Sequence, residues 1–413
     1  MSGKKISLIL YYIKYGLSFL IGWIFIVPLA YLIPKKRNLI LFIGVNDGLF
    51  IDNVKYLFTY LHNVKDHNRE IYFLTENKKV FNELKEKKLP VVFYPSLYGI
   101  FIMLRTSMLV VDNYWWYTNL KYYFFIKSYK IQLWHGVGFK IIGHSQLKFV
   151  NWFTRLFKKC VYILGGLYVK YDLFVSTSEF YTTNVFSKAF DYKEVIEAGY
   201  PRNDCFFMEL NDMLLMGTDK EKIKKVKEFK NNGYKIVIYL PTFSRTGRDP
   251  LMDGALDIKK LDEIAGKYKI LFILKFHPNP RHKYEVNELE HIIEYDNHKD
   301  VYPLLPLTDL MITDYSSIYT DYLFLDKPVV FFPYDFKHYI EKDGKFQFDY
   351  DWITPGPKCK NYDELEHEII SCIVEGKDEY KDKRREILDM AFRYKDGRTS
   401  ERIWNFVKKS SGF

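Results

Sequence analysis

The chain has 413 residues, of which 48% are hydrophobic and 27% are charged, and its net charge is +10 at pH 7. This composition excludes a generally disordered protein, and the length is sufficient for two domains and an appended segment. The cysteines are too scattered for a disulfide framework or a metal cage, which indicates a reducing compartment. They are Cys160, Cys205, Cys359 and Cys372.

The first predicted element is an apolar segment near the amino terminus. Residues 15–33 carry no charge, and a helix of this length can just span a bilayer core, although Pro28 should kink or end it. Basic residues flank both ends, so the orientation rule gives no answer. We expect residues 1–37 to associate with the cytoplasmic face of the cell membrane as an interfacial or re-entrant helix, with a full span as the alternative.

A basic and aromatic stretch follows between Asn113 and Lys170, where the sequence has no acidic residue. Such a surface can bind single-stranded nucleic acid or an anionic membrane, or it can be an ordinary solvated face. Because a predicted membrane segment lies in the same half of the chain, we favour contact with a membrane surface and expect no nucleic-acid partner.

The rest of the chain alternates short apolar runs with helical patterns, which is typical of α/β domains with parallel sheets. Strands are expected at residues 39–45, 71–74, 91–94, 108–112, 130–134, 173–177, 194–196, 235–240, 270–276, 310–313 and 329–332. We expect two doubly wound, Rossmann-like domains, at residues 38–198 and 199–384, that face a cleft. The charged segment 385–413 should be helical and pack back across both domains.

Five polar clusters follow predicted strands, where doubly wound sheets bind their ligands. The first is Trp134-His135-Gly136-Val137-Gly138. A neutral imidazole at His135 could act as general base for an acceptor hydroxyl, and the glycines allow the backbone to approach a ligand closely. The alternative is a histidine that is hydrogen-bonded within a turn.

Three further clusters offer cations and hydroxyls. Arg202, in the turn that begins at Gly199, has a planar guanidinium suited to phosphate, or it pairs with Asp204. Pro241 and Thr242 lead a loop with hydroxyl groups and a cation, although an ordinary loop without a ligand is the favoured alternative. Lys275 and His277 lie on the same face of an extended chain, where together they could stabilise charge on a leaving phosphate.

The fifth cluster is the polar turn at residues 313–317. A strand, a turn and a helix start direct free N–H groups at one point, and Ser316 and Ser317 add hydroxyl donors, so a phosphate would be well bound. A plain helix cap is the alternative. Asp321 could accept a hydrogen bond from a ribose hydroxyl or be neutralised by Lys327.

Together these clusters resemble the CDP-glycerol glycerophosphotransferase family of teichoic acid and capsule synthesis. The landmarks are Trp-His-Gly at 134–136, Gly-Tyr-Pro-Arg-Asn-Asp at 199–204, Pro-Thr-Phe at 241–243, His-Pro at 277–278 and Thr-Asp-Tyr-Ser-Ser at 313–317. Val137-Gly138 replaces the Thr-Pro that the family commonly carries, and Ser244 precedes Arg245 where an arginine usually follows directly. Both departures leave the polyol portion of the substrate open.

The resemblance implies a GT-B-like architecture in which the C-terminal domain binds most of the CDP. His135 and His277 are the implied catalytic residues. The implied substrate-binding residues are Trp134, Gly136, Val137, Gly138, Arg202, Pro241, Thr242, Lys275, Phe276, Ser316, Ser317 and Asp321. No bound prosthetic group is expected, and we see no acidic cluster that would hold a metal.

The implied function is transfer of glycerol phosphate from CDP-glycerol to a hydroxyl of a polyprenyl-pyrophosphate-linked saccharide, with release of CMP. The length of the chain favours addition of the first unit, as by a primase, over polymerisation. The alternatives are a CDP-ribitol donor, a nucleotide-sugar glycosyltransferase of the same fold, and a non-catalytic nucleotide binder.

Overall fold

The computed structural model describes residues 16–64, 68–149, 152, 165, 169–242, 246–276 and 289–410. The chain forms two compact units. The first unit consists of Met1–His135, Gly143–Arg202 and Arg398–Phe413, and the second of Gly136–Ile142 and Asn203–Gly397. One division therefore falls between His135 and Gly136, and another falls after Arg202 rather than at the expected position before Gly199.

The first unit is built on a seven-stranded parallel sheet in the order β3-β2-β1-β4-β5-β6-β7. The strands are β1 (Lys36–Ile43), β2 (Glu70–Thr75), β3 (Val91–Phe93), β4 (Thr106–Val111), β5 (Tyr129–Gln132), β6 (Lys170–Ser176) and β7 (Asp191–Glu197). All seven were expected from the sequence. The chain reverses its winding between β1 and β4, and doubly wound sheets bind ligands beyond the carboxyl ends of the strands at such a point.

Helices of the first unit begin where side chains can cap them. The side chain of Asn77 accepts hydrogen bonds from the amides of Lys79 and Val80 at the start of α5 (Lys78–Glu86), and Ser96 caps α6 (Leu97–Arg105). The other helical segments are α3 (Val45–Gly48), α4 (Asp52–Val64), α7 (Lys121–Phe124), η2 (Gly143–Phe149), α9 (Glu179–Tyr181), η3 (Thr182–Phe186), α10 (Ser187–Ala189) and η4 (Pro201–Phe207), which runs across the division after Arg202.

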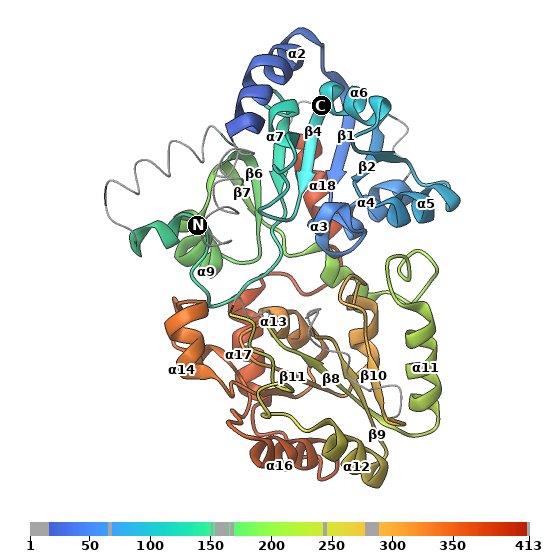
Figure 1. Cartoon of the computed structure of the whole chain (residues 1–413), viewed down its shortest axis with the longest axis vertical. Helices are drawn as coiled ribbons and strands as arrows, with labels where there is room; N and C mark the ends of the chain where they lie inside the picture. Colours follow the sequence, from blue (N-terminus) through green and yellow to red (C-terminus); the bar gives the residue numbers. More distant parts are fainter. Residues whose placement is uncertain are drawn as a thin grey trace, which may run out of the picture. The chain divides into compact units, whose positions relative to one another are not determined.

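The last helix of the chain, α18 (Thr399–Ser410), also belongs to the first unit. Its buried face carries Ile403, Trp404 and Val407, and it packs against α4. Figure 1 shows this red helix among the blue elements from the beginning of the chain. The two ends of the sequence therefore contribute to one core.

The apolar amino-terminal segment is helical from residue 16 to Leu32. It includes a π-helical turn, η1 (Gly22–Ile26), directly before α2 (Val27–Leu32). Pro28 lies in the first turn of α2, and an expanded turn is one way for a helix to accommodate the N–H group that proline lacks. Among the described residues, no helix combines the length and the apolarity needed to cross a membrane.

One side of this segment packs against the unit, and the other is exposed and apolar. Gly22 lies against the ring of Tyr123 in α7, and Ile26, Val27 and Ala30 are buried. The exposed apolar side chains are Leu17, Leu20, Ile21, Ile24, Phe25, Leu29, Tyr31 and Leu32.

The second unit contains a five-stranded parallel sheet in the order β10-β9-β8-β11-β12. The strands are β8 (Lys235–Leu240), β9 (Ile270–Leu274), β10 (Ile292–Glu294), β11 (Leu310–Thr313) and β12 (Val329–Phe331). Strand β10 was not expected, because its two isoleucines are too short a pattern to distinguish from a loop. Pairing with β9 makes it a strand.

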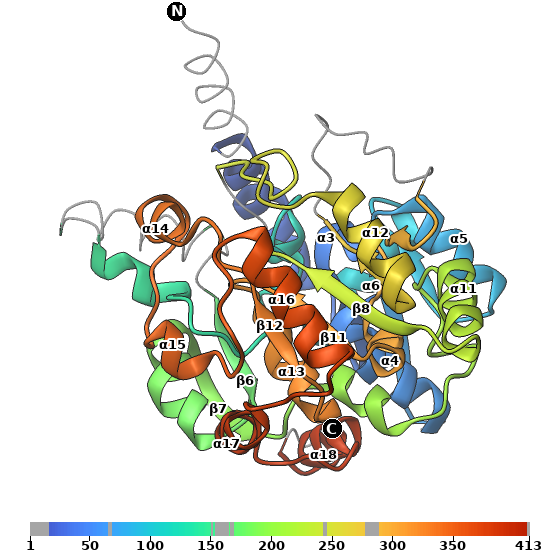
Figure 2. The ribbon, with the colours of Figure 1, turned by 90° about the horizontal axis from the view of Figure 1, so that it is seen from below.

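Helices pack against the second sheet and share one apolar core with its strands. Leu261 of α12 (Ile258–Tyr268) and Ile369 of α16 (Tyr362–Ile373) pack with the strands in this core, and Figure 2 shows α16 lying across the sheet near β12. The other helical segments are α11 (Lys220–Asn231), η6 (Tyr302–Leu307), α13 (Ile318–Tyr322), η7 (Leu323–Leu325), α14 (Phe336–His338), η8 (Tyr339–Asp343), α15 (Tyr350–Ile353) and α17 (Lys381–Ala391).

Candidate active site

His135 lies just beyond the carboxyl end of β5 in the first unit. Its Nδ1 is 2.8 Å from the backbone oxygen of Asp112. Since a carbonyl oxygen can only accept, we assign the proton of the neutral imidazole to Nδ1, which leaves the Nε2 lone pair as the acceptor. Burial lowers the pKa of His135, and this effect outweighs the opposing influence of the Asp52 carboxylate and of the Asp112 carbonyl. The imidazole is therefore neutral at pH 7.

Trp134 has an unusual backbone conformation directly before this histidine. Its φ is 57°, which is uncommon for a bulky residue and costs free energy that the surrounding structure must supply. Its amide donates to Gln132 Oε1 at 2.9 Å. The centre of its ring lies 4.2 Å from the centre of the His135 imidazole and 4.5 Å from the centre of the Phe190 ring. Trp134 is buried, and its ring packs on the imidazole of His135.

Arg202 belongs to the same cluster. Its Nη1 donates to Asp52 Oδ1 at 2.7 Å and to the backbone oxygen of His135 at 2.9 Å. The carboxylate that it contacts here belongs to Asp52, a residue distant in sequence. Arg202 is 2% exposed and lies in the first unit. Its contact with the His135 carbonyl fixes the turn that carries the imidazole.

Two residues that the sequence analysis did not select complete this cluster. Asn53 is fully buried; its Nδ2 donates to the oxygen of Trp134 at 2.7 Å, and its Oδ1 accepts from the amide of Arg202 at 3.1 Å. The carboxylate of Asp112 accepts from the amide of Val54 at 3.0 Å. Burial, and then the Asp52 carboxylate, raise the pKa of Asp112 well above its usual range.

A signal for these residues was present in the sequence. Asp112 directly follows β4, and Asp52 and Asn53 begin α4, which comes after β1 and the short α3. Both strands flank the point where the sheet reverses its winding, so their trailing polar residues occupy the usual ligand edge. Residue 112 was expected only as the end of the strand 108–112, because no histidine or glycine pattern lies beside it.

The second unit carries the serine turn between β11 and α13. Ser316 and Ser317 are half-buried, and within the described residues their backbone N–H groups donate to no acceptor. Ser317 occupies the N-cap position of α13, but its side chain makes no capping hydrogen bond. The alternative reading of this turn as a plain side-chain cap is therefore wrong for Ser317.

The glycine loop at residues 136–138 packs closely on this turn within the same unit. A Cβ atom at Gly136 would lie 2.4 Å from Ser317 Oγ, and one at Gly138 would lie 3.1 Å from Ser317 Cβ. The oxygen of Val137 accepts a hydrogen bond from Thr320 Oγ1 at 3.1 Å. Val137 is fully buried, so the loop is required for close packing, and only its backbone can reach a ligand.

Thr242, Asp314 of the predicted polar turn and the unexpected residue Lys140 form a polar group at the ends of β8 and β11. The amide of Thr242 donates to both carboxylate oxygens of Asp314, at 2.8 and 3.0 Å, while Lys140 Nζ donates to Thr242 Oγ1 at 3.4 Å. Burial raises the pKa of Asp314 against the influence of Thr242 and Lys140. Pro241 is half-buried next to this group.

Several predicted ligand contacts are instead used inside the second unit. Asp321 is fully buried, and its Oδ2 accepts a hydrogen bond from Tyr302 at 3.0 Å, a partner that was not expected. Lys275 Nζ donates to the backbone oxygens of Asp296 at 3.0 Å and Lys299 at 3.3 Å, so it holds that loop. Phe276 packs edge-on against Tyr239 in the core. His277 lies outside the described residues.

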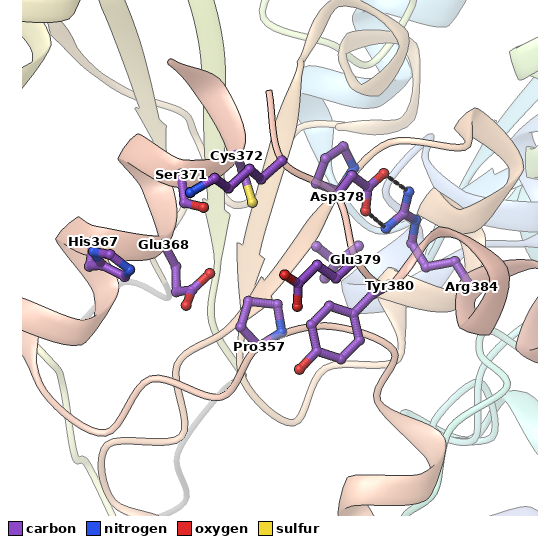
Figure 3. Close-up of a pocket in the computed structure, with 12 residues that line it drawn as sticks. Pro357, His367, Glu368, Ser371, Cys372, Asp378, Glu379, Tyr380 and Arg384 are labelled. Carbon is purple, nitrogen blue, oxygen red and sulfur yellow. Dashed lines mark hydrogen bonds and ion pairs between the residues drawn. The ribbon is translucent and has the colours of Figure 1, made fainter. Parts of the chain in front are cut away.

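A separate pocket of about 210 Å³ lies at the amino end of β12 in the second unit. Figure 3 shows the bidentate ion pair between Arg384 and Asp378 at its wall. None of the predicted site residues lines this pocket. In the described part of the chain, no group of three or more histidine, cysteine, aspartate or glutamate residues is placed to hold a metal ion.

A family model described as CDP-Glycerol:Poly(glycerophosphate) glycerophosphotransferase matches residues 25–409. The chain is 27% identical over 390 residues to the teichoic acid poly(glycerol phosphate) polymerase of Bacillus subtilis (strain 168), covering 91% of this chain and 49% of that protein. It is 25% identical over 391 residues to the teichoic acid glycerol-phosphate transferase of Staphylococcus aureus (strain NCTC 8325 / PS 47), covering 91% and 94%. The chain thus spans about half the length of the first of these relatives.

Among solved structures, the wall teichoic acid polymerase TagF soaked with CDPG matches with a TM-score of 0.67 at 23% identity. The match covers 91% of this chain and 89% of that chain. At this level of identity the likeness shows the fold, which is α/β with parallel sheets as in TagF.

Proposed function

The chain belongs to the CDP-Glycerol:Poly(glycerophosphate) glycerophosphotransferase family, and from this premise we propose that it transfers glycerol phosphate from CDP-glycerol to a hydroxyl of a membrane lipid-linked saccharide. The observation that carries the proposal is the hydrogen bond between His135 Nδ1 and the Asp112 carbonyl. This bond and the lowered pKa of His135 leave Nε2 unprotonated at neutral pH, so that it can accept a proton.

In the proposed reaction, His135 Nε2 accepts the proton of the acceptor hydroxyl as its oxygen attacks the β-phosphorus of CDP-glycerol. A bond forms between this oxygen and the β-phosphorus, and the bond from the β-phosphorus to the bridging oxygen breaks. The bridging oxygen leaves with CMP. Phosphoryl transfer needs mainly positioning and charge stabilisation, so no covalent enzyme intermediate is required.

The serine turn supports binding of the donor in the second unit. The open N–H groups of Ser316 and Ser317, their hydroxyls, and the nearby Lys140 cation suit a pyrophosphate. Arg202 is assigned to the turn of His135 and not to the donor.

The donor polyol is the finer part of the proposal, and ribitol is a specific second candidate. The chain is also 27% identical over 282 residues to the teichoic acid ribitol-phosphate primase of Bacillus spizizenii (strain ATCC 23059 / NRRL B-14472 / W23). We favour glycerol and addition of a first unit over polymerisation. The exposed apolar side chains of residues 17–32 support a site at the cytoplasmic face of a bacterial membrane.

The test is CMP release from CDP-glycerol and from CDP-ribitol, with and without a lipid-linked saccharide acceptor. We expect acceptor-dependent CMP release that is faster with CDP-glycerol, and a single added unit by product sizing. His135→Ala should slow turnover by a factor on the order of 10²–10⁴ while CDP-glycerol still binds, as expected for loss of a general base. Near-normal turnover by this variant would remove His135 from the role of base.

A further inference from the structure

A basic pocket of about 470 Å³ lies in the first unit, at the amino ends of β1, β5 and β6. His135 follows the carboxyl end of β5, so the length of this four-residue strand, about 13 Å, separates the two places. The pocket therefore lies outside the candidate active site. Its charged lining residues are Lys35, Arg37, Lys127, Lys130, Lys170, Asp172 and Lys193.

The positive charge of this lysine pocket is poorly compensated from within the protein. Asp172, the one carboxylate of the lining, accepts from the amide of Lys130 at 2.8 Å and from Lys193 Nζ at 2.6 Å, so both of its oxygens are engaged. Among the described residues, neither Arg37 nor Lys170 takes part in an ion pair; the neighbouring pairs are formed by Lys36 with Glu70 and by Lys193 with Asp172. An anion from outside would find several cations without a counter-charge.

Two of the lysines have side chains that are hydrogen-bonded to backbone oxygens of the protein. Lys130 is 8% exposed, and its Nζ donates to the oxygen of Ser128 at 2.9 Å; Lys35 Nζ donates to the oxygen of Phe124 at 3.0 Å. Burial lowers the pKa of both lysines to about 8, and for Lys35 the nearby charges of Lys130 and Lys127 lower it further. A bound anion would offset this burial and repulsion.

The lysine pocket adjoins the exposed apolar side of the amino-terminal helix. Lys127 Nζ lies 5.2 Å from the centre of the Tyr31 ring, and Figure 1 shows α2 beside α7, with which it is in contact. Leu29 and Leu32 are 46% and 78% exposed. Cations beside exposed apolar and aromatic side chains match the headgroup and acyl layers of a membrane surface.

We propose that the lysine pocket binds the phosphate group of an anionic membrane-lipid headgroup, while the apolar side chains of residues 17–32 enter the acyl layer. This site is separate from the one that receives the acceptor. It does not depend on the proposed reaction, because lipid binding is measured without donor, and His135→Ala should bind vesicles as the parent does.

The test is co-sedimentation of the full chain with vesicles of phosphatidylcholine, with or without phosphatidylglycerol. The triple variant Arg37→Gln, Lys127→Gln, Lys170→Gln removes exposed cations of the pocket. We expect roughly a tenfold or greater loss of affinity for the anionic vesicles. The matched control, Lys78→Gln, Lys79→Gln, Lys87→Gln, removes the same charge from exposed positions in the same unit and should bind about as well as the parent.

Three outcomes would overturn the proposal. Equal losses in the two triple variants would mean that diffuse charge, and not the pocket, attracts the membrane. Displacement of the protein from vesicles by soluble glycerol 3-phosphate would identify a free phosphate as the ligand instead of a lipid. Unchanged vesicle binding by Leu29→Gln, Leu32→Gln would exclude insertion of the apolar helix; the expected result is weaker binding to both kinds of vesicle.

Discussion

At the scale of single residues, the site depends on a backbone atom more than on a second charged side chain. The Asp112 carbonyl sets the tautomer of His135, while the Asp112 carboxylate is used elsewhere, at the amide of Val54. A neutral carbonyl oxygen stabilises the protonated form of a histidine less than a carboxylate would. Burial therefore dominates and lowers the pKa of His135.

This lowered pKa predicts the pH dependence of the reaction. The proposed base works only when it is neutral, so activity is lost as pH falls through the pKa of His135. Because this pKa is lowered, the acid limb of kcat/KM should lie below about 6.5, the ordinary value for histidine. The measurement is the pH profile of CMP release, with His298→Gln as a control at an exposed histidine. An acid limb at or above 6.5 would contradict the burial argument.

At the scale of elements, the glycine loop at residues 136–138 tolerates only small residues at its two glycine positions. The 136–138 loop approaches Ser317 so closely that position 136 has no room for a methyl group. The requirement is steric, because the added atom would meet Ser317 Oγ at 2.4 Å. The serine turn and the glycine loop therefore form one packed structure, and changes in either should affect the other.

Gly136→Ala tests this coupling. Overpacking should lower the free energy of unfolding by about 1–3 kcal/mol and should weaken donor binding, because the loop must move away from the serine turn. Adding Ser317→Ala removes the clashing oxygen and should recover part of the stability but not the donor affinity. Chemical denaturation and CDP-glycerol binding measure the two effects.

The control for this pair is Gly16→Ala. No atom lies within 4 Å of an added Cβ there, and alanine favours a helix more than glycine does, so stability should stay equal or rise slightly. A Gly136→Ala variant as stable as the parent, with unchanged donor binding, would show that the loop relaxes freely.

At the scale of the whole molecule, neither unit is a single continuous stretch of the sequence. Residues 136–142 belong to the second unit although they lie within the first half of the chain, and Arg398–Phe413 belong to the first unit although they end it. The segment 385–413, which we expected to pack across both domains, is divided between the units: Arg398–Phe413, with α18, belong to the first unit and complete its core. Helix α17 stays with the second unit.

Trp404→Ala should therefore destabilise the first unit. Trp404 is 4% exposed, and its ring lies 5.8 Å from the guanidinium carbon of Arg69. Loss of a buried tryptophan costs about 3–5 kcal/mol. Hydrogen exchange should report lost protection in α4, against which α18 packs, while α12 of the second unit keeps its protection. Asn405→Ala, at an exposed position of the same helix, is the control. A greater loss of exchange protection in α12 than in α4 would contradict the assignment of α18 to the first unit.

Much of the fold could be predicted because buried parallel strands have a strong local signal. Each apolar run, such as the fully buried β4 and β9, must be covered on both faces, so its sequence is apolar throughout. Strand β10 lacks that signal and depends on its partner β9. The carboxyl ends of the strands then indicated His135, Thr242 and the serine turn, because ligand sites of doubly wound sheets lie there.

The sequence by itself determined two doubly wound α/β halves, the position of His135 at a strand end, and the family, because strand patterns and motif order are local properties of the chain. Only the tertiary structure decided which polar side chains are used in contacts within the protein. Arg202, Lys275 and Asp321 have the residue types expected of ligand contacts, yet contacts with Asp52, with the carbonyls of Asp296 and Lys299, and with Tyr302 engage them internally. The physical reason is that a buried polar group must be hydrogen-bonded, and its partner is set by packing between residues far apart in sequence, which no local pattern records.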